Sequence, residues 1–487
     1  MAKRKRNRKP PQARHGKKSP RSRHDKRKRL ETPNPQRRVT QTAKVPLLGM
    51  IAAVVGSMAR LLDPRSGFRL SIIFAGAMLA TGRRTASSWF RAGGVLGDWD
   101  RFYELLGTVG KKATILASTL LQQIVRRFDP GPDGYWKIAI DDSPTKRYGR
   151  CVEAANVHHN PTPGPADGQW MYGHCWVCLA ILMNHPVFGV IALSVLSRLY
   201  VRKEDVAELK QRYGWEFRTK LELALEMILS VTGTLKALGS QARFMVIFDG
   251  AYAKRCLVKP LVDKGMTVVS RLRHDAKLFD LPGPPSEKRG RRRIYGKKRI
   301  HLKNQAARAA GWREVQYSVR GVVINGRCKD FVATSAMVSG QIRVVLLEHP
   351  GGKWAAYFST DISLTAEDIL EAVGDRWAIE EHFHDVKEVW GAGEQQVRNV
   401  WSNIACWNIC GWLYTLVELA CWESSAEDLV DRSDRPWDNP SRRPSHADRR
   451  RYLAGKMLRN ELKSVLPPAP EAAKIGEAFE LLLSLAA

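Results

Sequence analysis

Hydrophobic and polar positions alternate with different periods along the chain, and these periods predict its elements. From 46 to 130, apolar residues recur at helical spacing between glycine-rich or charged breaks, which predicts several helices. After residue 134, short apolar runs typical of buried strands alternate with helical patterns. The strand-like runs are Tyr135–Ile140, Trp170–Leu182, Val187–Tyr200, Phe244–Phe248 and Met266–Leu272, and the helical ones are 203–238 and Ala251–Asp263. This order predicts an α/β fold, a mixed sheet with helices on its faces.

Residues 274–360 change to the two-residue alternation of exposed strands. Turns are expected at Asn325-Gly326 and at Pro350–Gly352. The segment therefore reads as a β-rich insertion into the core. Thr365 and Asp368 then form a capping box, which predicts a long helix from about 366 to 390.

These patterns divide the chain into six parts. They are a disordered basic arm (1–45), a helical domain (46–130), the first part of the core (131–273), the β-rich insertion with a basic patch (274–360), the second part of the core (361–422) and C-terminal loops and helices (423–487). The helical domain is a candidate DNA-binding domain, because a helix pattern followed by a glycine turn at 83–94 is compatible with helix-turn-helix recognition.

Positive charge is concentrated in two of these parts. The chain carries 79 Lys and Arg against 48 Asp and Glu, a net charge of +31. Residues 1–45 hold 18 of the basic residues but only Asp25 and Glu31 as acids, so they act as a solubilising tail or bind phosphates. The basic patch in 285–303 includes Arg291, Arg292, Arg293, Lys297 and Lys298. A polyanionic partner is expected.

Cysteine usage and hydropathy indicate the compartment. Eight cysteines are scattered among apolar runs, which favours reduced thiols over a disulfide framework. The apolar run Val45–Ala59 is shorter than the roughly 18–20 residues that span a bilayer and reads as a core helix. We expect a cytoplasmic, nucleoid-associated protein without a membrane partner.

Candidate chemistry lies in carboxylates at the ends of elements. Asp141 and Asp142 end the first strand, Asp249 ends the central strand and Glu380 lies in the long helix. Two divalent cations that hold a scissile phosphate need carboxylates brought together from different elements. Strand alternation sends Asp141 and Asp142 to opposite faces, so only one of them points at a shared site. This spacing leaves open which one.

The long helix places two cations beside its carboxylate. Arg376, Glu380 and Lys387 are four and seven residues apart and fall within one narrow stripe. The arrangement indicates a metal ligand beside groups that hold phosphate oxygens. The alternative is an ordinary ion-pair ladder on an exposed helix. Val373 and Phe383 share the stripe, which indicates that this face is partly covered.

The three carboxylates in order, together with Arg376, Glu380 and Lys387, resemble the signature of bacterial insertion-sequence DDE transposases. That signature is Y-(2)-R-(3)-E-(6)-K, and its first position is Val373 here. The resemblance covers about 134–422 and implies an RNase H-like core, of the retroviral-integrase superfamily, interrupted by a β-rich insertion. It implies Asp141, rather than Asp142, as the first metal ligand, with Asp249 and Glu380 completing the set.

The resemblance also implies the activity. Two Mg²⁺ ions, or Mn²⁺, would support cleavage at the ends of an element and joining of the 3′-OH ends to target DNA, by a homodimer in a bacterial host. The expected DNA contacts are Arg376, Lys387, Arg271, Arg273, the basic patch, and Arg83 and Arg84 before a helix and glycine turn. The alternatives are a DNA-binding derivative without chemistry and a metal-dependent nuclease without strand transfer.

Overall fold

A twelve-stranded mixed sheet organises the protein in the computed structural model, which describes residues 48–160, 163, 168–284, 292–430, 432, 437–439, 441–465 and 475–476. The strand order is β2-β3-β1-β5-β6-β12-β11-β10-β7-β8, with β4 on β3 and β9 on β10. The predicted arm at 1–45 lies outside the described residues. The strands are β1 (Tyr135–Lys146), β2 (Asn156–His159), β3 (Trp170–His185), β4 (Gly189–Tyr200), β5 (Arg243–Phe248), β6 (Thr267–Leu272), β7 (Leu278–Phe279), β8 (Arg299–Ile300), β9 (Arg313–Val319), β10 (Val322–Ser335), β11 (Gly340–His349) and β12 (Lys353–Ser359).

Strand β1 lies at the centre of the core part of the sheet. It pairs antiparallel with β3 and parallel with β5, while β5 pairs parallel with β6. The mixed α/β architecture predicted from the strand runs is therefore confirmed, and this strand order is consistent with an RNase H-like core.

Strand β1 is longer than its apolar run predicts. Pairing with β3 continues to Lys146, whereas pairing with β5 stops at Ile140. Asp141 and Asp142 therefore lie inside β1 and do not end it, which corrects the expectation from sequence. The polar residues 141–146 remain in a strand because β3 supplies their hydrogen-bond partners.

The β-rich insertion extends the core sheet. Strand β12 pairs with β11 on one side and with β6 on the other. One predicted turn was wrong: Asn325 and Gly326 lie within β10, opposite Gln316 and Val315. The chain reverses instead at Arg320-Gly321, where both residues have positive φ (57° and 79°). The predicted turn at Pro350–Gly352 is confirmed.

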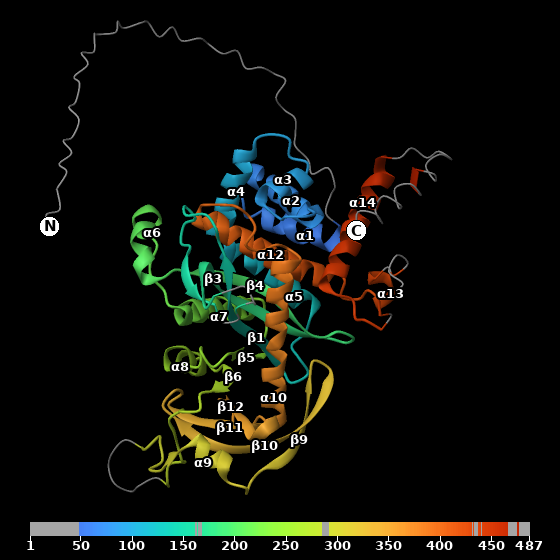
Figure 1. The fold of residues 1–487 in the computed structure, drawn as a ribbon. Helices are drawn as coiled ribbons and strands as arrows, with labels where there is room; N and C mark the ends of the chain where they lie inside the picture. Colours follow the sequence, from blue (N-terminus) through green and yellow to red (C-terminus); the bar gives the residue numbers. More distant parts are fainter. Residues whose placement is uncertain are drawn as a thin grey trace, which may run out of the picture. The chain divides into compact units, whose positions relative to one another are not determined.

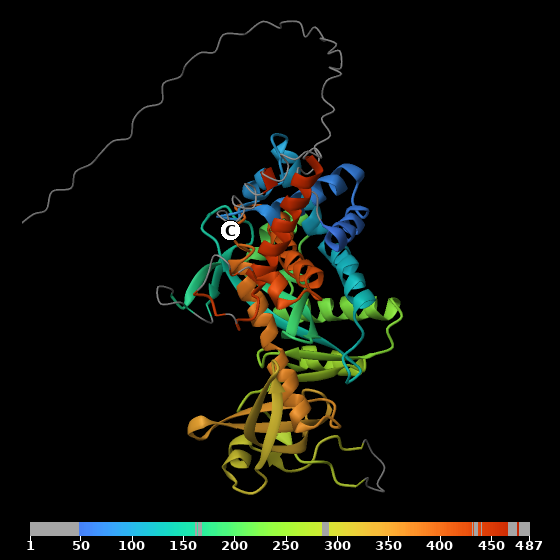
Figure 2. The same ribbon diagram turned by 90° about the vertical axis from the view of Figure 1, so that its right-hand side faces the viewer.

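Helices cover both faces of the sheet. On one face α7 (Lys220–Ala237) packs on β3 and β4, and α8 (Arg255–Asp263) packs on β6. On the other, α10 (Ala366–Asp375) packs on β6 and β12, α11 (Trp377–Glu388) on β1 and β4, and α12 (Val400–Ala420) on β4. Figures 1 and 2 show α7 and α8 in green and α10 in orange on opposite sides. The remaining helices are α1 (Gly49–Ala59), α2 (Pro64–Leu79), α3 (Ala86–Ala92), α4 (Trp99–Lys111), α5 (Ala113–Arg127), α6 (Val206–Tyr213), α9 (Leu302–Ala307), α13 (Ala426–Leu429) and α14 (His446–Val465), with 3-10 turns at Lys203–Asp205 and Pro350–Gly352.

Two helical predictions were too long, and each has a local cause. The pattern over 203–238 is divided between α6 and α7, because Gly214 takes a left-handed conformation and Thr219 begins α7 with a capping box. The segment after Asp249 turns before α8 begins at Arg255. The long helix predicted over 366–390 is observed as α10 and α11, joined through Arg376 with helical backbone angles (φ −56°, ψ −31°).

The N-terminal helices share one core with the sheet. Buried side chains of α1–α5 belong to the same apolar cluster as those of β1 and α12. Helix α4 packs on α12, and α5 packs on β4. The predicted core helix in Val45–Ala59 is observed as α1, with Ile51, Val54 and Val55 buried. None of the helices in the described ranges is long and apolar enough to cross a bilayer.

A buried histidine on β3 is fixed in its neutral form. His174 is fully buried, and its Nδ1 accepts a hydrogen bond from Arg147 Nε (3.2 Å). Its Nε2 therefore carries the proton and donates to the Glu153 carbonyl (2.9 Å). Burial lowers the pKa of His174 to about 3, and the nearby Arg147 acts in the same direction.

This histidine predicts an acid sensitivity. Below its ordinary pKa the unfolded chain takes up a proton that the folded chain does not, so stability falls as pH drops from about 6.5 toward 3. His174→Gln removes this contribution. Between pH 7 and 5.5, the fall in the free energy of unfolding measured with urea should be about 1 kcal/mol smaller in the variant. Equal falls in both proteins would contradict the assignment.

Candidate functional site

The two neighbouring aspartates of β1 face opposite sides of the sheet, as strand alternation predicted. Asp141 contacts Arg376, which joins α10 to α11, and Asp142 contacts Lys220, the first residue of α7. Because α11 and α7 cover opposite faces, the two carboxylates belong to different environments.

Asp141 and Glu380 are held together by one guanidinium. Arg376 Nη1 lies 2.5 Å from Asp141 Oδ2, and Nη2 lies 2.9 Å from Glu380 Oε1. The side chains of Arg376 and Asp141 are only 11% and 17% exposed, whereas that of Glu380 is 39% exposed. The predicted i, i+4 contact between Arg376 and Glu380 is therefore present, but its face is turned to the sheet. A surface ladder does not describe it.

Asp141 is poorly compensated in this position. Burial raises its pKa to about 7, although Arg376 and the hydrogen bond from Asp142 N–H (2.8 Å) act against the shift. The charges of Asp142 and Glu380 raise it further. A carboxylate in this state gains from any additional cation.

Asp249 follows the last residue of β5. Phe248 is the register partner of Ile140 in the parallel pair, so Asp249 comes directly after β5 at the level where Asp141 follows in β1. Its Oδ2 accepts from Ala251 N–H (3.3 Å). Within the described chain no cation pairs with Asp249. The register therefore brings the second predicted carboxylate beside the first.

Lys387 lies on the sheet side of α11. Burial lowers the pKa of its ammonium, and among the groups that act against this shift is Cys178, the cross-strand neighbour of Asp141. Among the described residues it has no ion-pair partner. The helix thus brings Arg376, Glu380 and Lys387 to the face where Asp141 lies, as the stripe predicted.

Asp142 belongs to a separate cluster that the sequence did not indicate. Its carboxylate accepts from Lys220 Nζ (2.6 Å), Tyr252 OH (3.0 Å) and Cys175 Sγ (3.4 Å). Burial and the Asp142 charge raise the pKa of the Tyr252 phenol, which keeps it a donor. The capping box at Thr219 marks the start of the helix that carries Lys220, but nothing local connects it to residue 142. This cluster satisfies Asp142 internally.

The donor set suits a hard divalent cation, with one obstacle. Asp141, Asp249 and Glu380 offer carboxylate oxygens, which Mg²⁺ and Mn²⁺ prefer. As the described residues are placed, no three His, Cys, Asp or Glu side chains are close enough together to hold a metal ion. The charge between Asp141 and Glu380 is the Arg376 guanidinium, which stands where a cation would be held. The donor types fit the ion, but holding it requires both that the guanidinium moves and that the three carboxylates lie closer together than they do here.

The predicted DNA contacts differ in accessibility. Arg271 and Arg273 are exposed at the end of β6, and Arg273 pairs with Asp275 (2.9 Å). Arg83 is exposed, but Arg84 is buried and donates to the Ala80 carbonyl (2.7 Å). The side chain of Arg84 is therefore used inside the protein, which corrects its prediction as a DNA contact. Its place next to Arg83 in the sequence gives no sign of this difference.

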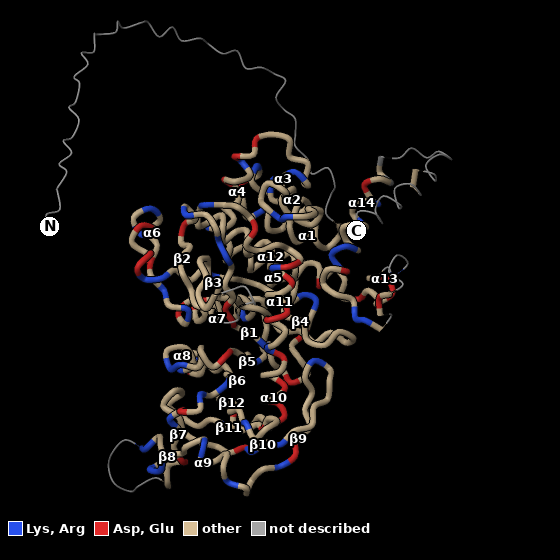
Figure 3. The backbone as a smooth tube through the Cα atoms, in the orientation of Figure 1, with Lys and Arg blue, Asp and Glu red and all other residues tan. Residues whose placement is uncertain are grey.

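The basic patch lies far along the sheet from the carboxylates. Arg292, Arg293, Lys297 and Lys298 are exposed around β8 (Figure 3), and Arg291 lies outside the described residues. Strands β6, β12, β11, β10 and β7 separate β8 from β5. The patch is therefore not part of the carboxylate site.

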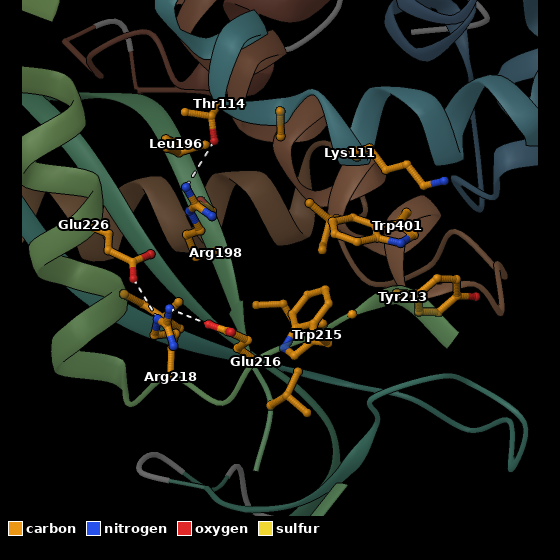
Figure 4. A pocket seen from close by; sticks show the side chains of 18 residues that line it. Lys111, Thr114, Leu196, Arg198, Tyr213, Trp215, Glu216, Arg218, Glu226 and Trp401 are labelled. Carbon is orange, nitrogen blue, oxygen red and sulfur yellow. Dashed lines mark hydrogen bonds and ion pairs between the residues drawn. The ribbon is translucent and has the colours of Figure 1, made fainter. Parts of the chain in front are cut away.

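A cavity of about 400 Å³ lies elsewhere, between β4, α5, α7 and α12. Trp215 and Trp401 line it with ring centroids 5.1 Å apart, and Arg198 reaches Thr114 (3.2 Å) (Figure 4). None of the three carboxylates borders it. The candidate site is an open group of side chains at the sheet and α11, and this cavity is separate from it.

Comparison with known proteins identifies the kind of enzyme. A family model described as DDE superfamily endonuclease matches residues 61–327, a span that includes Asp141 and Asp249 and ends before Glu380. No curated protein matches the chain. Among solved structures, a synaptic complex of piggyBac transposase with hairpin DNA is similar at a TM-score of 0.37 and 12% identity, over 86% of this chain and 73% of that chain.

The Asp142 cluster predicts a stability effect that is independent of the Asp141 site. Asp142→Asn should lower the free energy of unfolding by about 1–2 kcal/mol, because it leaves a half-buried Lys220 without its carboxylate. In a double-mutant cycle with Lys220→Met, chemical denaturation should show a double variant less destabilised than the sum of the two single variants. Strict additivity would show that this contact does not stabilise the fold.

Proposed function

The chain belongs to the DDE superfamily endonucleases, and from this we propose that it is a transposase that cuts and joins DNA. In this proposal it binds the ends of an insertion sequence, cleaves them with the help of bound metal and joins the freed 3′-OH ends to target DNA. The single observation that carries the proposal is the convergence of Asp141 and Glu380, from a central strand and a packed helix, on the face that Asp249 shares by register.

The proposed roles follow from position. Asp141, Asp249 and Glu380 would hold two Mg²⁺ ions, or Mn²⁺, which supply charge neutralisation at the scissile phosphate and activation of the attacking oxygen. The hydrogen bond from Asp142 N–H (2.8 Å) fixes the orientation of the Asp141 carboxylate. Arg376 and Lys387 border the carboxylates and are suited to hold phosphate oxygens.

The proposed chemistry uses two transfers at phosphorus. In the first, a water oxygen bonds to the scissile phosphorus and the bond to the 3′ oxygen breaks, which leaves a 3′-OH on the element. In the second, that 3′-OH bonds to a target phosphorus and the target 3′ oxygen leaves. Because both steps pass through a similar charged arrangement, one carboxylate site serves both.

The remaining parts of the proposal concern DNA and assembly. We assign DNA contact to Arg271, to the exposed Arg83 before α3, and to the basic patch, within an RNase H-like core and an N-terminal helical region. A homodimer is proposed because two element ends have to be joined. Val373, where the resembled signature has Tyr, removes one phenol from this surface.

The carboxylate assignment predicts a separation of cleavage from binding. Asp141→Asn, Asp249→Asn and Glu380→Gln should each lower Mg²⁺-dependent cleavage of DNA carrying the candidate ends by at least about 100-fold, because each removes a metal ligand. DNA affinity measured by fluorescence anisotropy without divalent metal should not fall in any of the three variants. Glu388→Gln, an exposed acid on the same helix, is the matched control and should cleave normally.

The outcomes of that assay also distinguish the alternatives. Cleavage without joining by the wild type indicates a nuclease, and binding without cleavage indicates a DNA-binding derivative. Cleavage by Glu380→Gln at the wild-type rate would contradict the assignment of Asp141, Asp249 and Glu380 as metal ligands. Asp142→Asn should retain far more activity than Asp141→Asn, since Asp142 is satisfied on the other face.

Arg271 and Arg273 predict unequal effects on DNA affinity. Both are exposed, but Arg273 is compensated by Asp275 (2.9 Å), so its charge contributes less to phosphate binding. Arg271→Ala should weaken binding and reduce the slope of log affinity against log salt by about one. Arg273→Ala should change both much less. Equal slopes for the two variants would show that the pairing with Asp275 does not reduce the contribution of Arg273.

A further inference from the structure

The position of Arg376 carries an inference about how the carboxylate site is controlled. Its guanidinium uses one nitrogen for Asp141 Oδ2 (2.5 Å) and the other for Glu380 Oε1 (2.9 Å). In the described part of the chain, Arg376 is the one basic residue in contact with either carboxylate. At 11% side-chain exposure it is enclosed between the sheet and the start of α11.

A guanidinium and a metal ion cannot share these oxygens. A divalent cation bound by Asp141 and Glu380 lies within a few ångströms of both, in the space that the guanidinium fills. Two cations at that distance also repel strongly where water is partly excluded. Metal binding therefore requires the Arg376 guanidinium to leave the two carboxylates. This departure leaves the guanidinium unpaired, which is costly unless another anion accepts it.

A phosphate group is the anion that suits this exchange. The planar fork that now bridges two carboxylates matches two oxygens of one phosphate equally well. The Arg376 guanidinium lies 5.7 Å from the ring centroid of Trp377, a residue that is half exposed. The guanidinium therefore lies next to a side chain that reaches the surface.

Neighbouring groups mark a receiving place for that phosphate. Tyr357 on β12 is the register partner of Arg271 on β6, so both side chains lie on one face of the sheet. Burial raises the pKa of Tyr357, while Arg271 and Arg376 both act to lower it, which places the phenol near both cations. Within the described residues its hydroxyl has no hydrogen-bond partner. A phenol and an exposed arginine thus lie side by side on this face of the sheet, near enough to Arg376 for its charge to act on the phenol.

We propose that Arg376 is an interlock between DNA and metal: it bridges Asp141 and Glu380 in the DNA-free protein and moves to a DNA phosphate held with Arg271 and Tyr357, which frees the carboxylates for the metal. The proposal rests on the function proposed above. Its consequence is positive cooperativity, in which DNA raises metal affinity and metal raises DNA affinity by the same factor. The protein would then load metal only where DNA is present.

The test is metal affinity of the full chain without catalysis. Isothermal titration with Mn²⁺ alone should show Arg376→Gln binding at least tenfold more tightly than wild type, because the competing cation is gone. Adding a duplex that carries the terminal sequence flanking the gene should tighten Mn²⁺ binding to wild type by a similar factor, and to Arg376→Gln much less. Glu380→Gln should lose this Mn²⁺ binding, which identifies the site.

Arg320→Gln is the matched control. Arg320 also pairs with a carboxylate of α11, Glu381, but away from Asp141, so its loss should leave Mn²⁺ affinity unchanged. If Arg376→Gln does not fold, Arg376→Lys, which keeps the charge but loses the fork, should show a smaller gain in Mn²⁺ affinity. Unfolding is followed by circular dichroism.

Two results would overturn the interlock, and they are separable from failure of the function. If Arg376→Gln, or Arg376→Lys in its place, binds Mn²⁺ no more tightly than wild type, Arg376 is a structural clamp, and Mg²⁺-dependent cleavage by wild type still supports the transposase. If Glu380→Gln binds Mn²⁺ as wild type does, the carboxylate site itself is wrongly assigned and both proposals fall.

Discussion

Strand β1 pairs with β3 along its whole length but with β5 only as far as Ile140, and the site depends on this mismatch. Up to Ile140 both edges of β1 are occupied and its side chains are buried. From Asp141 onward one edge is open, because the chain leaves β5 at Asp249. Asp141 on β1 and Asp249 after β5 therefore follow each other in register at the point where the two strands separate. Strand β3 still pairs with β1 at this point.

The insertion fixes the third carboxylate through the same sheet. Strand β12 returns the chain to β6, and the capping box of Thr365 begins α10 six residues after β12 ends. Tyr135 OH donates to Asp361 in that connection (2.9 Å), which ties it to the first residue of β1. Lys137 on β1 contacts Asp375 at the end of α10 (3.3 Å). Two contacts with β1 thus hold the start and the end of the segment that leads into α11, the helix that carries Glu380.

Much of this arrangement could be predicted because it follows from local pattern. The apolar runs of β3, β4, β5 and β6 and the capping box of α10 are properties of adjacent residues. The stripe of Arg376, Glu380 and Lys387 is a property of helix geometry. The errors arose where a strand distant in the sequence determines the local conformation. Pairing with β3 keeps polar residues 141–146 in a strand, and pairing with Gln316 and Val315 keeps Asn325 and Gly326 in an extended conformation. The choice between Asp141 and Asp142 depends on which helix covers each face, which alternation cannot supply.

The ion pairs of the two adjacent aspartates of β1 differ in a way that suits different purposes. Asp142 accepts hydrogen bonds from Lys220, Tyr252 and Cys175 on one face. Its charge is therefore compensated within the protein, and its ion pair with Lys220 stabilises the fold. Asp141 shares one guanidinium with Glu380, and burial still raises its pKa to about 7. An incomplete pair that is 39% exposed at Glu380 can exchange its cation when another anion accepts the guanidinium, whereas the fully hydrogen-bonded Asp142 gains nothing from such an exchange. Adjacent residues of one strand are thus held in different ways, because the sheet turns one toward α7 and the other toward α11, and the proposed chemistry uses the one that is incompletely paired.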